Sequence, residues 1–210
     1  MTLVNFALVV LGENFPVTTL DLRDFEFRHR KLRETLRLPL IMQAESDSVR
    51  LQVLAERFEI AVTRPDRVDV QVEGVTAMVE GLFEYVGPKA ISAIGHNAVF
   101  RLDGSAPNAN AYLNSLVDMP AVEGVLLSTI PVVTQQHFFF RRGHETQARV
   151  SLGLTETGEV AFDFNFHYDL KSSESNTTAR SAIGRMAESL QAAEEMVGSF
   201  EMLFQRVRVA

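Results

Sequence analysis

Polar and apolar residues alternate in residues 159–170, which read EVAFDFNFHYDL. The even-numbered residues are aromatic or aliphatic, whereas the odd-numbered residues include Asp163, Asn165, His167 and Asp169. Because successive side chains of a strand point to opposite faces, the pattern predicts a strand with one buried and one polar face. An imidazole near carboxylates is the set of groups that general acid–base chemistry uses. This polar face is therefore the first candidate for a catalytic site.

A cationic residue on the preceding predicted strand, residues 148–154, completes this candidate site. Two registers of the hairpin bring the apolar faces together. In one, Arg149 stands opposite Asp163; in the other, it stands opposite Asn165 with Asp163 on the diagonal. A catalytic hypothesis makes His167 a general base oriented by an aspartate, with Arg149 as an anion holder. Neighbours on one strand face are about 6.6 Å apart, so ordinary cross-strand pairs on a wet face are the favoured interpretation.

Histidines provide a further hypothesis, a metal site. His137 and His144 flank the run FFFRRG, and together with His167 they are expected on neighbouring segments. Three convergent imidazoles would suit a metal ion, but the need for all three to converge makes this the less favoured interpretation. The sequence contains no phosphate loop, dinucleotide fingerprint or nucleophile elbow. It therefore favours a protein without cofactor or metal, and a non-enzymatic role over an enzymatic one.

A basic segment occupies residues 28–37, which read RHRKLRETLR. The favoured interpretation is a solvated, helix-like face that Leu32 and Leu36, at spacing i, i+4, hold to the core. Contact with nucleic acid is the alternative, and the net charge of −7 argues against it because phosphate binding needs a basic face. The candidate residues for that contact are Arg28, Arg30, Lys31, Arg33 and Arg37.

The strongest periodicity lies in residues 175–206, which predict one long C-terminal helix. Its apolar residues step alternately by four and three, the seam spacing of a coiled coil. At 1.5 Å per residue this helix spans about 48 Å, so its own sheet need not cover all of it. Two hypotheses follow: the seam packs on the chain's own sheet, or it also pairs with a second copy about a twofold axis. The candidate partner-binding residues are Ile183, Met186, Leu190, Val197, Phe200 and Phe204.

Strand patterns precede this helix along the chain. The continuous apolar run of residues 5–11 predicts a central strand covered on both faces. Alternating residues 49–53, 58–62 and 68–73 predict a three-stranded antiparallel meander. Helical spacing then begins at Val75 and is stopped by Gly87-Pro88.

Residues 89–210 repeat this order of opening strand, connection, antiparallel strands and closing helix. The sequence therefore predicts an α+β fold of antiparallel meanders backed by helices. Two similar halves, residues 1–88 and 89–210, are expected to form one compact unit, and a duplication is a hypothesis because no residue signature repeats.

Composition limits the class of protein. The 210 residues contain no cysteine, which excludes disulfides, thiolate catalysis and cysteine-held metals. No window approaches the ~20 apolar residues of a membrane-spanning helix, and the N-terminal run lacks a basic start, so we expect a cytoplasmic protein.

The leading functional hypothesis is a non-enzymatic interaction or assembly module. It self-associates, most simply as a dimer, or binds another protein through the long C-terminal helix and the aromatic-rich strands. An enzyme or ligand-binding protein that uses the polar sheet face around Arg149, Asp163 and His167 comes second. Nucleic-acid contact through residues 28–37 comes third.

Overall fold

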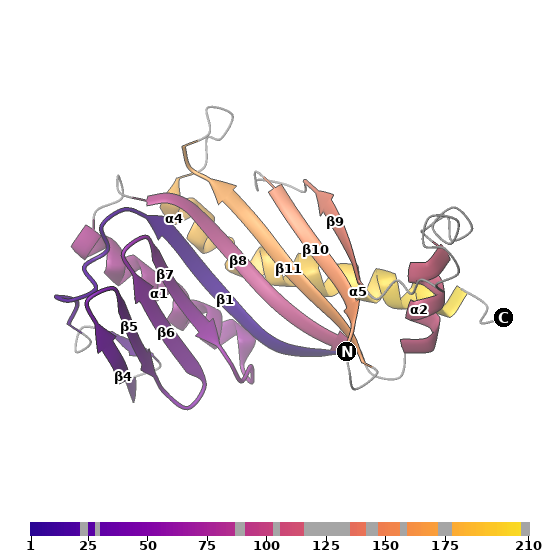
Figure 1. Ribbon diagram of the computed structural model, residues 1–210, viewed down its shortest axis with the longest axis horizontal. Helices are drawn as coiled ribbons and strands as arrows, with labels where there is room; N and C mark the ends of the chain where they lie inside the picture. Colours follow the sequence, from indigo (N-terminus) through magenta and orange to yellow (C-terminus); the bar gives the residue numbers. More distant parts are fainter. Residues whose placement is uncertain are drawn as a thin grey trace, which may run out of the picture.

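A single nine-stranded antiparallel sheet forms the body of the protein, as seen in a computed structural model. The structure describes residues 1–21, 25–27, 30–86, 91–102, 106–115, 135–141, 147–155, 159–171 and 178–206. The strand order is β4-β5-β6-β7-β1-β8-β11-β10-β9 (Figure 1). A separate pair is formed by β2 and β3. The α+β prediction of antiparallel meanders backed by helices is confirmed.

The strands of the first half are β1 (Thr2–Gly12), β2 (Glu26–Phe27), β3 (Arg30–Lys31), β4 (Arg33–Leu38), β5 (Ile41–Glu45), β6 (Val49–Leu54) and β7 (Arg57–Val62). Those of the second half are β8 (Ile91–Leu102), β9 (Gln135–Phe140), β10 (Gln147–Leu154) and β11 (Val160–Asp169). The helices are α1 (Val68–Val86), α2 (Ala106–Ser115), α4 (Ala179–Gly184) and α5 (Met186–Arg206).

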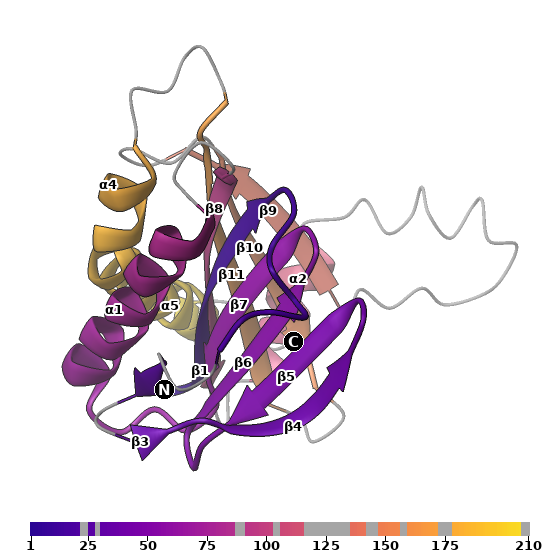
Figure 2. The same ribbon diagram turned by 90° about the vertical axis from the view of Figure 1, so that its left-hand side faces the viewer.

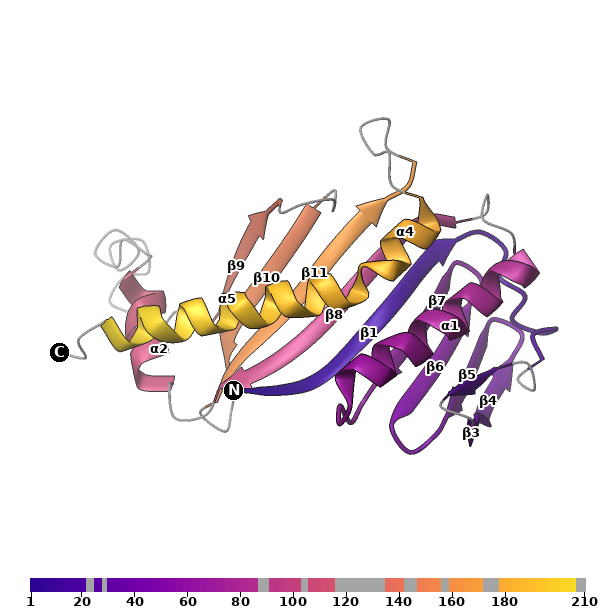
Figure 3. The same ribbon diagram turned by 180° about the vertical axis from the view of Figure 1, so that it is seen from behind.

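The hydrophobic core lies between the sheet and the helices on one of its faces. Helices α1, α4 and α5 all lie on that side (Figure 2), and α5 crosses the second half of the sheet diagonally (Figure 3). On β1, Phe6, Leu8 and Val10 point to the helices and are fully buried. The other face, called the open face below, has no described helix on it. Ala7 and Val9 of β1 are nevertheless shielded there, so this central strand is buried on both faces.

Each half follows the same topology around the centre of the sheet. Strand β1 pairs with β7, the last strand of the first meander, and α1 follows β7. Strand β8 pairs with β11, the last strand of the second meander, and α4 and α5 follow β11. Because β1 and β8 pair with each other, one continuous sheet crosses the boundary at residues 88–89. That the halves arose by duplication stays a hypothesis.

Residues 68–73 form the first turns of α1, and the prediction of a third meander strand there was wrong. Val68, Val72 and Val75 recur at i, i+4 and i+7, so the alternating valines also satisfy a helical face. Gln71 is fully buried and fastens this end of the helix. Its amide accepts from the Asp66 backbone N–H and donates to the Arg64 carbonyl, both at 3.1 Å. These tertiary contacts override the β propensity of valine.

The described part of residues 28–37 forms strands rather than the predicted helix-like face. Strand β4 pairs antiparallel with β5 through a hairpin turn that contains Pro39, and a register shift lies between Glu34 and Leu36. The charged residues therefore lie along an edge of the sheet. A sheet edge tolerates charge because no further strand pairs with it, which explains why a charged segment can be extended here.

The predicted long C-terminal helix is divided into two. Thr178 caps α4 by accepting a hydrogen bond from the Ser181 N–H at 3.2 Å. The regular helix is interrupted at Arg185, and α5 begins at Met186. None of the described helices contains an 18-residue stretch apolar enough to span a membrane.

Gly74 of α1 is expected to be intolerant of a side chain. A Cβ atom there would lie 2.9 Å from Cε2 of Phe27, whose ring is buried between β2 and the helix. We expect Gly74→Ala to lower the free energy of unfolding by about 1–3 kcal/mol, as overpacking does. Gly81→Ala is the matched control, since nothing lies within 4 Å of its Cβ, and it should gain up to ~1 kcal/mol. Urea unfolding compares the two; equal stability would contradict the packing of Phe27 on α1.

Candidate functional site

The polar face of residues 159–170 lies on the open face of the sheet. Strand β11 pairs with β10 with Val150 opposite Phe164, and this places Arg149 opposite Asn165 with Asp163 on the diagonal. The second of the two registers predicted from the sequence is therefore the one observed. Asn165 donates a hydrogen bond from its side-chain amide to the side chain of Asn97 on β8.

The Asp163 carboxyl is perturbed by its surroundings. Partial burial raises its pKa, and the positive charge of Arg149 opposes that shift. We expect Arg149→Gln to raise the Asp163 pKa further, because only the opposing charge is removed. A carboxyl-carbon NMR titration measures the effect, with Arg50→Gln on distant β6 as the control. An unchanged Asp163 titration in Arg149→Gln would show that the two groups do not interact.

A serine and a histidine also meet on the open face, a pair that the sequence did not reveal. Nδ1 of His137 lies 2.7 Å from Oγ of Ser151, and Asp163 stands opposite Ser151 on its other side. A catalytic triad needs the carboxylate against the histidine, whereas here it flanks the serine. His137, Ser151 and Asp163 are therefore not arranged as in a triad that activates a nucleophile.

His167 stands apart from this pair. It lies opposite Gln147 on β10 and Gly95 on β8, and the observed registers place it two rows from Ser151. Residue 144, the third histidine of the metal hypothesis, lies outside the described residues. Within the described part of the chain, no group of three His, Asp or Glu side chains is placed to hold a metal ion.

A second polar cluster is buried between the sheet and α5. Nδ1 of His96 on β8 lies 2.8 Å from Oγ of Ser189, and the Tyr168 hydroxyl lies 3.2 Å from the same oxygen. Burial lowers the pKa of His96 to about 3, and the backbone of Ala182 opposes this only in part. The imidazole is therefore neutral at physiological pH. The sequence marks this residue as a histidine at one of the positions of an apolar strand that point toward the core.

The candidate partner-binding residues of the C-terminal helices face the chain's own sheet. Phe200 is half-buried and its ring packs on Phe138 of β9 and Tyr112 of α2 at centroid distances of 5.6 and 6.4 Å. The coiled-coil spacing thus marks the face that packs on the chain's own sheet, and pairing of the helix with a second copy stays a hypothesis. The buried members of the set are Ile183, Met186, Leu190, Val197 and Phe204.

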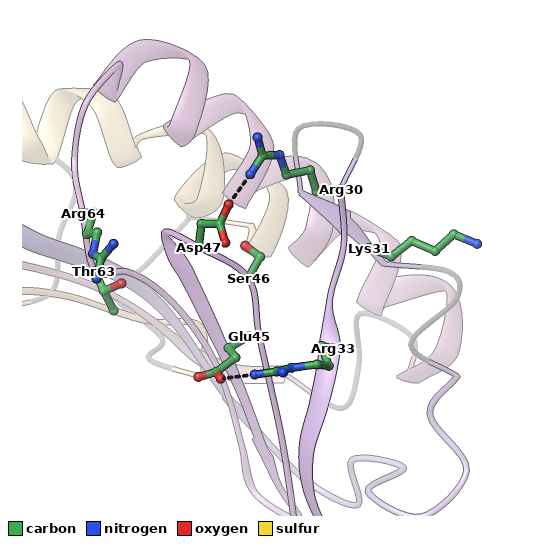
Figure 4. A pocket seen from close by; sticks show the side chains of 8 residues that line it. All are labelled: Arg30, Lys31, Arg33, Glu45, Ser46, Asp47, Thr63 and Arg64. Atoms are coloured by element: carbon green, nitrogen blue, oxygen red, sulfur yellow. Dashed lines mark hydrogen bonds and ion pairs between the residues drawn. The ribbon is translucent and has the colours of Figure 1, made fainter.

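The basic segment borders a hollow at the corner of the sheet, called the corner hollow below (Figure 4). Its volume is about 630 Å³, and a smaller hollow of about 470 Å³ shares Arg30, Ser46, Asp47 and Arg64 with it. The corner hollow is lined by Arg30, Lys31, Arg33, Glu45, Ser46, Asp47, Thr63 and Arg64.

The candidate nucleic-acid residues are therefore not one surface. Arg30 pairs with Asp47, and Arg33 pairs with Glu45 at 3.1 Å. Lys31 also lines the corner hollow, and its side chain points away from the other labelled side chains (Figure 4). Residue 28 lies outside the described residues, and the position of Arg37 is considered next.

Arg37 serves the fold. Its guanidinium donates hydrogen bonds to the carbonyls of Val17, Thr18 and Leu20 at 2.9–3.3 Å and pairs with Glu34 at 2.6 Å. It thereby holds the loop after β1 against the edge of the first meander. The sequence could not show this because the loop and Arg37 are far apart along the chain.

The sequence matches no protein-family model and no curated protein. Function must therefore be inferred from the geometry of this chain. The described residues present three features for that purpose: the polar open face, the corner hollow, and the edges of the sheet.

Proposed function

We propose that the protein is a non-enzymatic assembly module whose chains join through edge strand β9. The observation that supports this most is the exposure of Phe139 within its run of three phenylalanines. Phe139 is 64% exposed on the open face, and Phe138 and Phe140 on the helix face are half-buried. Among the described residues only β10 pairs with β9, so one side of its backbone has no strand partner. An uncharged, aromatic edge that no other described strand covers is a template for strand addition.

The opposite edge of the sheet provides a contrast. Strand β4 carries Arg33, Glu34 and Arg37 and contains a register shift, features that discourage pairing with a further strand. Strand β9 reads QQHFFF, without Asp, Glu, Lys, Arg or Pro, and its pairing with β10 has no register shift. The two edges therefore differ in the features that protect sheets from association.

A second copy of the chain suits β9 as its partner. In antiparallel self-pairing about a twofold axis at Phe138, His137 faces Phe139 of the other copy and Gln136 faces Phe140. Apolar and aromatic groups then meet on both faces of the joined sheet. No charge lies within β9, so the twofold axis brings no like charges together.

Helix α5 supports this edge from behind. Its Phe200 packs on Phe138 and fixes the position of β9 on the helix face. We therefore propose that the aromatic strand, rather than the seam of the helix, makes the contact between chains. A cytoplasmic location stays a prediction.

Phe139→Lys tests the proposal. Lysine on an edge strand opposes pairing, and the 64% exposure of Phe139 means that the core is untouched. We expect the dimer dissociation constant to rise at least about tenfold, equivalent to 1.4 kcal/mol, with unchanged unfolding of the monomer. Leu40→Lys is the matched control, because Leu40 is 73% exposed at the β4–β5 turn, far from β9 in the sheet order. Equal masses by light scattering for the two variants would refute the role of β9.

A further inference from the structure

We propose that the corner hollow binds the phosphate group of a small phosphorylated molecule. Three guanidinium groups line it, those of Arg30, Arg33 and Arg64 (Figure 4). Planar guanidinium groups with several N–H donors match phosphate oxygens better than any other side chain. This site is independent of the proposed pairing of β9, which lies at the other end of the sheet.

Four cationic and two anionic side chains line the hollow, so two cations, Lys31 and Arg64, have no ion pair among the described residues. Asp47 pairs with Arg30 and Glu45 with Arg33. Each of the two paired arginines uses part of its donor set on its carboxylate, which leaves further N–H groups for a ligand. The hollow is thus locally positive in a chain with a net charge of −7.

Two connections of the fold and the strands β3 and β4 build the site. Residues 46–48 turn tightly between β5 and β6, where the Ser46 N–H donates to the Val49 carbonyl at 2.8 Å. Thr63 and Arg64 follow β7, and the buried Gln71 fixes the Arg64 carbonyl. Arg30 and Arg33 reach this corner from β3 and β4, and their ion-paired side chains are 67% and 80% exposed. A ligand therefore meets donors that come from separate parts of the fold and remain accessible to it.

Size and chemistry define the ligand class. A hollow of about 630 Å³ is in the range of small-molecule sites and exceeds a bare phosphate. Hydroxyls of Ser46 and Thr63 supplement the arginines and suit phosphate oxygens. We infer a phosphomonoester, whose organic part occupies the remaining volume.

Inorganic phosphate is the probe for the first experiment. Titration calorimetry of the full chain at low ionic strength should detect binding that sodium chloride at equal ionic strength does not reproduce. Arg64→Gln should weaken it at least about tenfold, as expected for loss of a charged hydrogen-bond partner. Arg67→Gln is the matched control, since Arg67 is exposed nearby and does not line the hollow.

Asp47→Asn should change phosphate binding in the opposite direction to Arg64→Gln. Removing a negative charge at the hollow should tighten phosphate binding by about threefold, the Coulomb effect expected at a solvent-exposed site. A single-stranded oligonucleotide without terminal phosphate serves as the other arm. The proposal is overturned if phosphate gives no binding beyond chloride, if Arg64→Gln and Arg67→Gln behave alike, if Asp47→Asn weakens binding, or if the oligonucleotide binds and phosphate does not.

Discussion

Val197→Asp is expected to unfold most of the protein. Val197 lies at the middle of the α5 seam and is fully buried against the chain's own core. The new carboxylate would have no cationic partner there, and an unpaired buried charge costs about 3–5 kcal/mol. That is a large share of the 5–15 kcal/mol that stabilises a typical domain. Far-UV circular dichroism and urea unfolding measure the loss.

Ala187→Asp is the matched control for this change. Ala187 is exposed near the start of α5, so we expect an effect within about 0.5 kcal/mol. These two variants also test whether the α5 seam packs only within the chain or forms an interface between chains. If Val197→Asp remained folded while its molar mass halved, the seam would be an interface between chains and not an intrachain core.

Stability is expected to fall as the pH drops below 6.5, and His96 should account for a defined part of the fall. Its pKa is lowered from 6.5 to about 3 in the fold. Between these two pH values the imidazole is protonated in the unfolded chain and neutral in the folded chain. The contribution of His96 to the free energy of unfolding is fully present above pH 6.5 and is lost progressively as the pH falls to about 3. At 1.36 kcal/mol per pH unit, the loss between pH 7 and pH 5 is about 2 kcal/mol.

His96→Leu isolates that contribution. The variant should show a fall in unfolding free energy between pH 7 and pH 5 that is about 2 kcal/mol smaller than in the parent. The comparison uses the change with pH, so an altered stability at pH 7 does not affect it. The same pH dependence in His96→Leu as in the parent would show that the imidazole is not held neutral by the fold.

Side-chain parity made the second half of the fold predictable. The alternation in residues 159–170 defined both the buried face of β11 and the polar residues beside Arg149, and the hairpin register was one of two considered. The spacing of Met186, Leu190 and Val197 likewise defined the buried face of α5. A period in the sequence identifies a face, but it does not tell whether the covering surface belongs to the same chain.

The errors lie where local pattern and tertiary contact disagree. Val68, Val70 and Val72 alternate like a strand, yet they lie in a helix whose Gln71 amide bonds to the loop before α1. The charged residues 28–37 resemble a solvated helix until the pairing with β5 is known.

Sites formed by distant segments were also beyond the sequence. The corner hollow joins β3 and β4 to the turn after β5 and the end of β7. The cluster of His96 and Ser189 joins residues 93 positions apart. Strand β9 is visible in the sequence as a run of aromatic residues, but only the strand order shows that it is an edge.

Molar mass by light scattering over a dilution series tests the assembly through β9 most directly. The chain has a mass of 23.4 kDa, so we predict twice that mass at high concentration and a decrease toward the single-chain mass on dilution. Phe139→Lys should show the single-chain mass throughout the series. A parent protein of 23.4 kDa at every concentration would contradict the account.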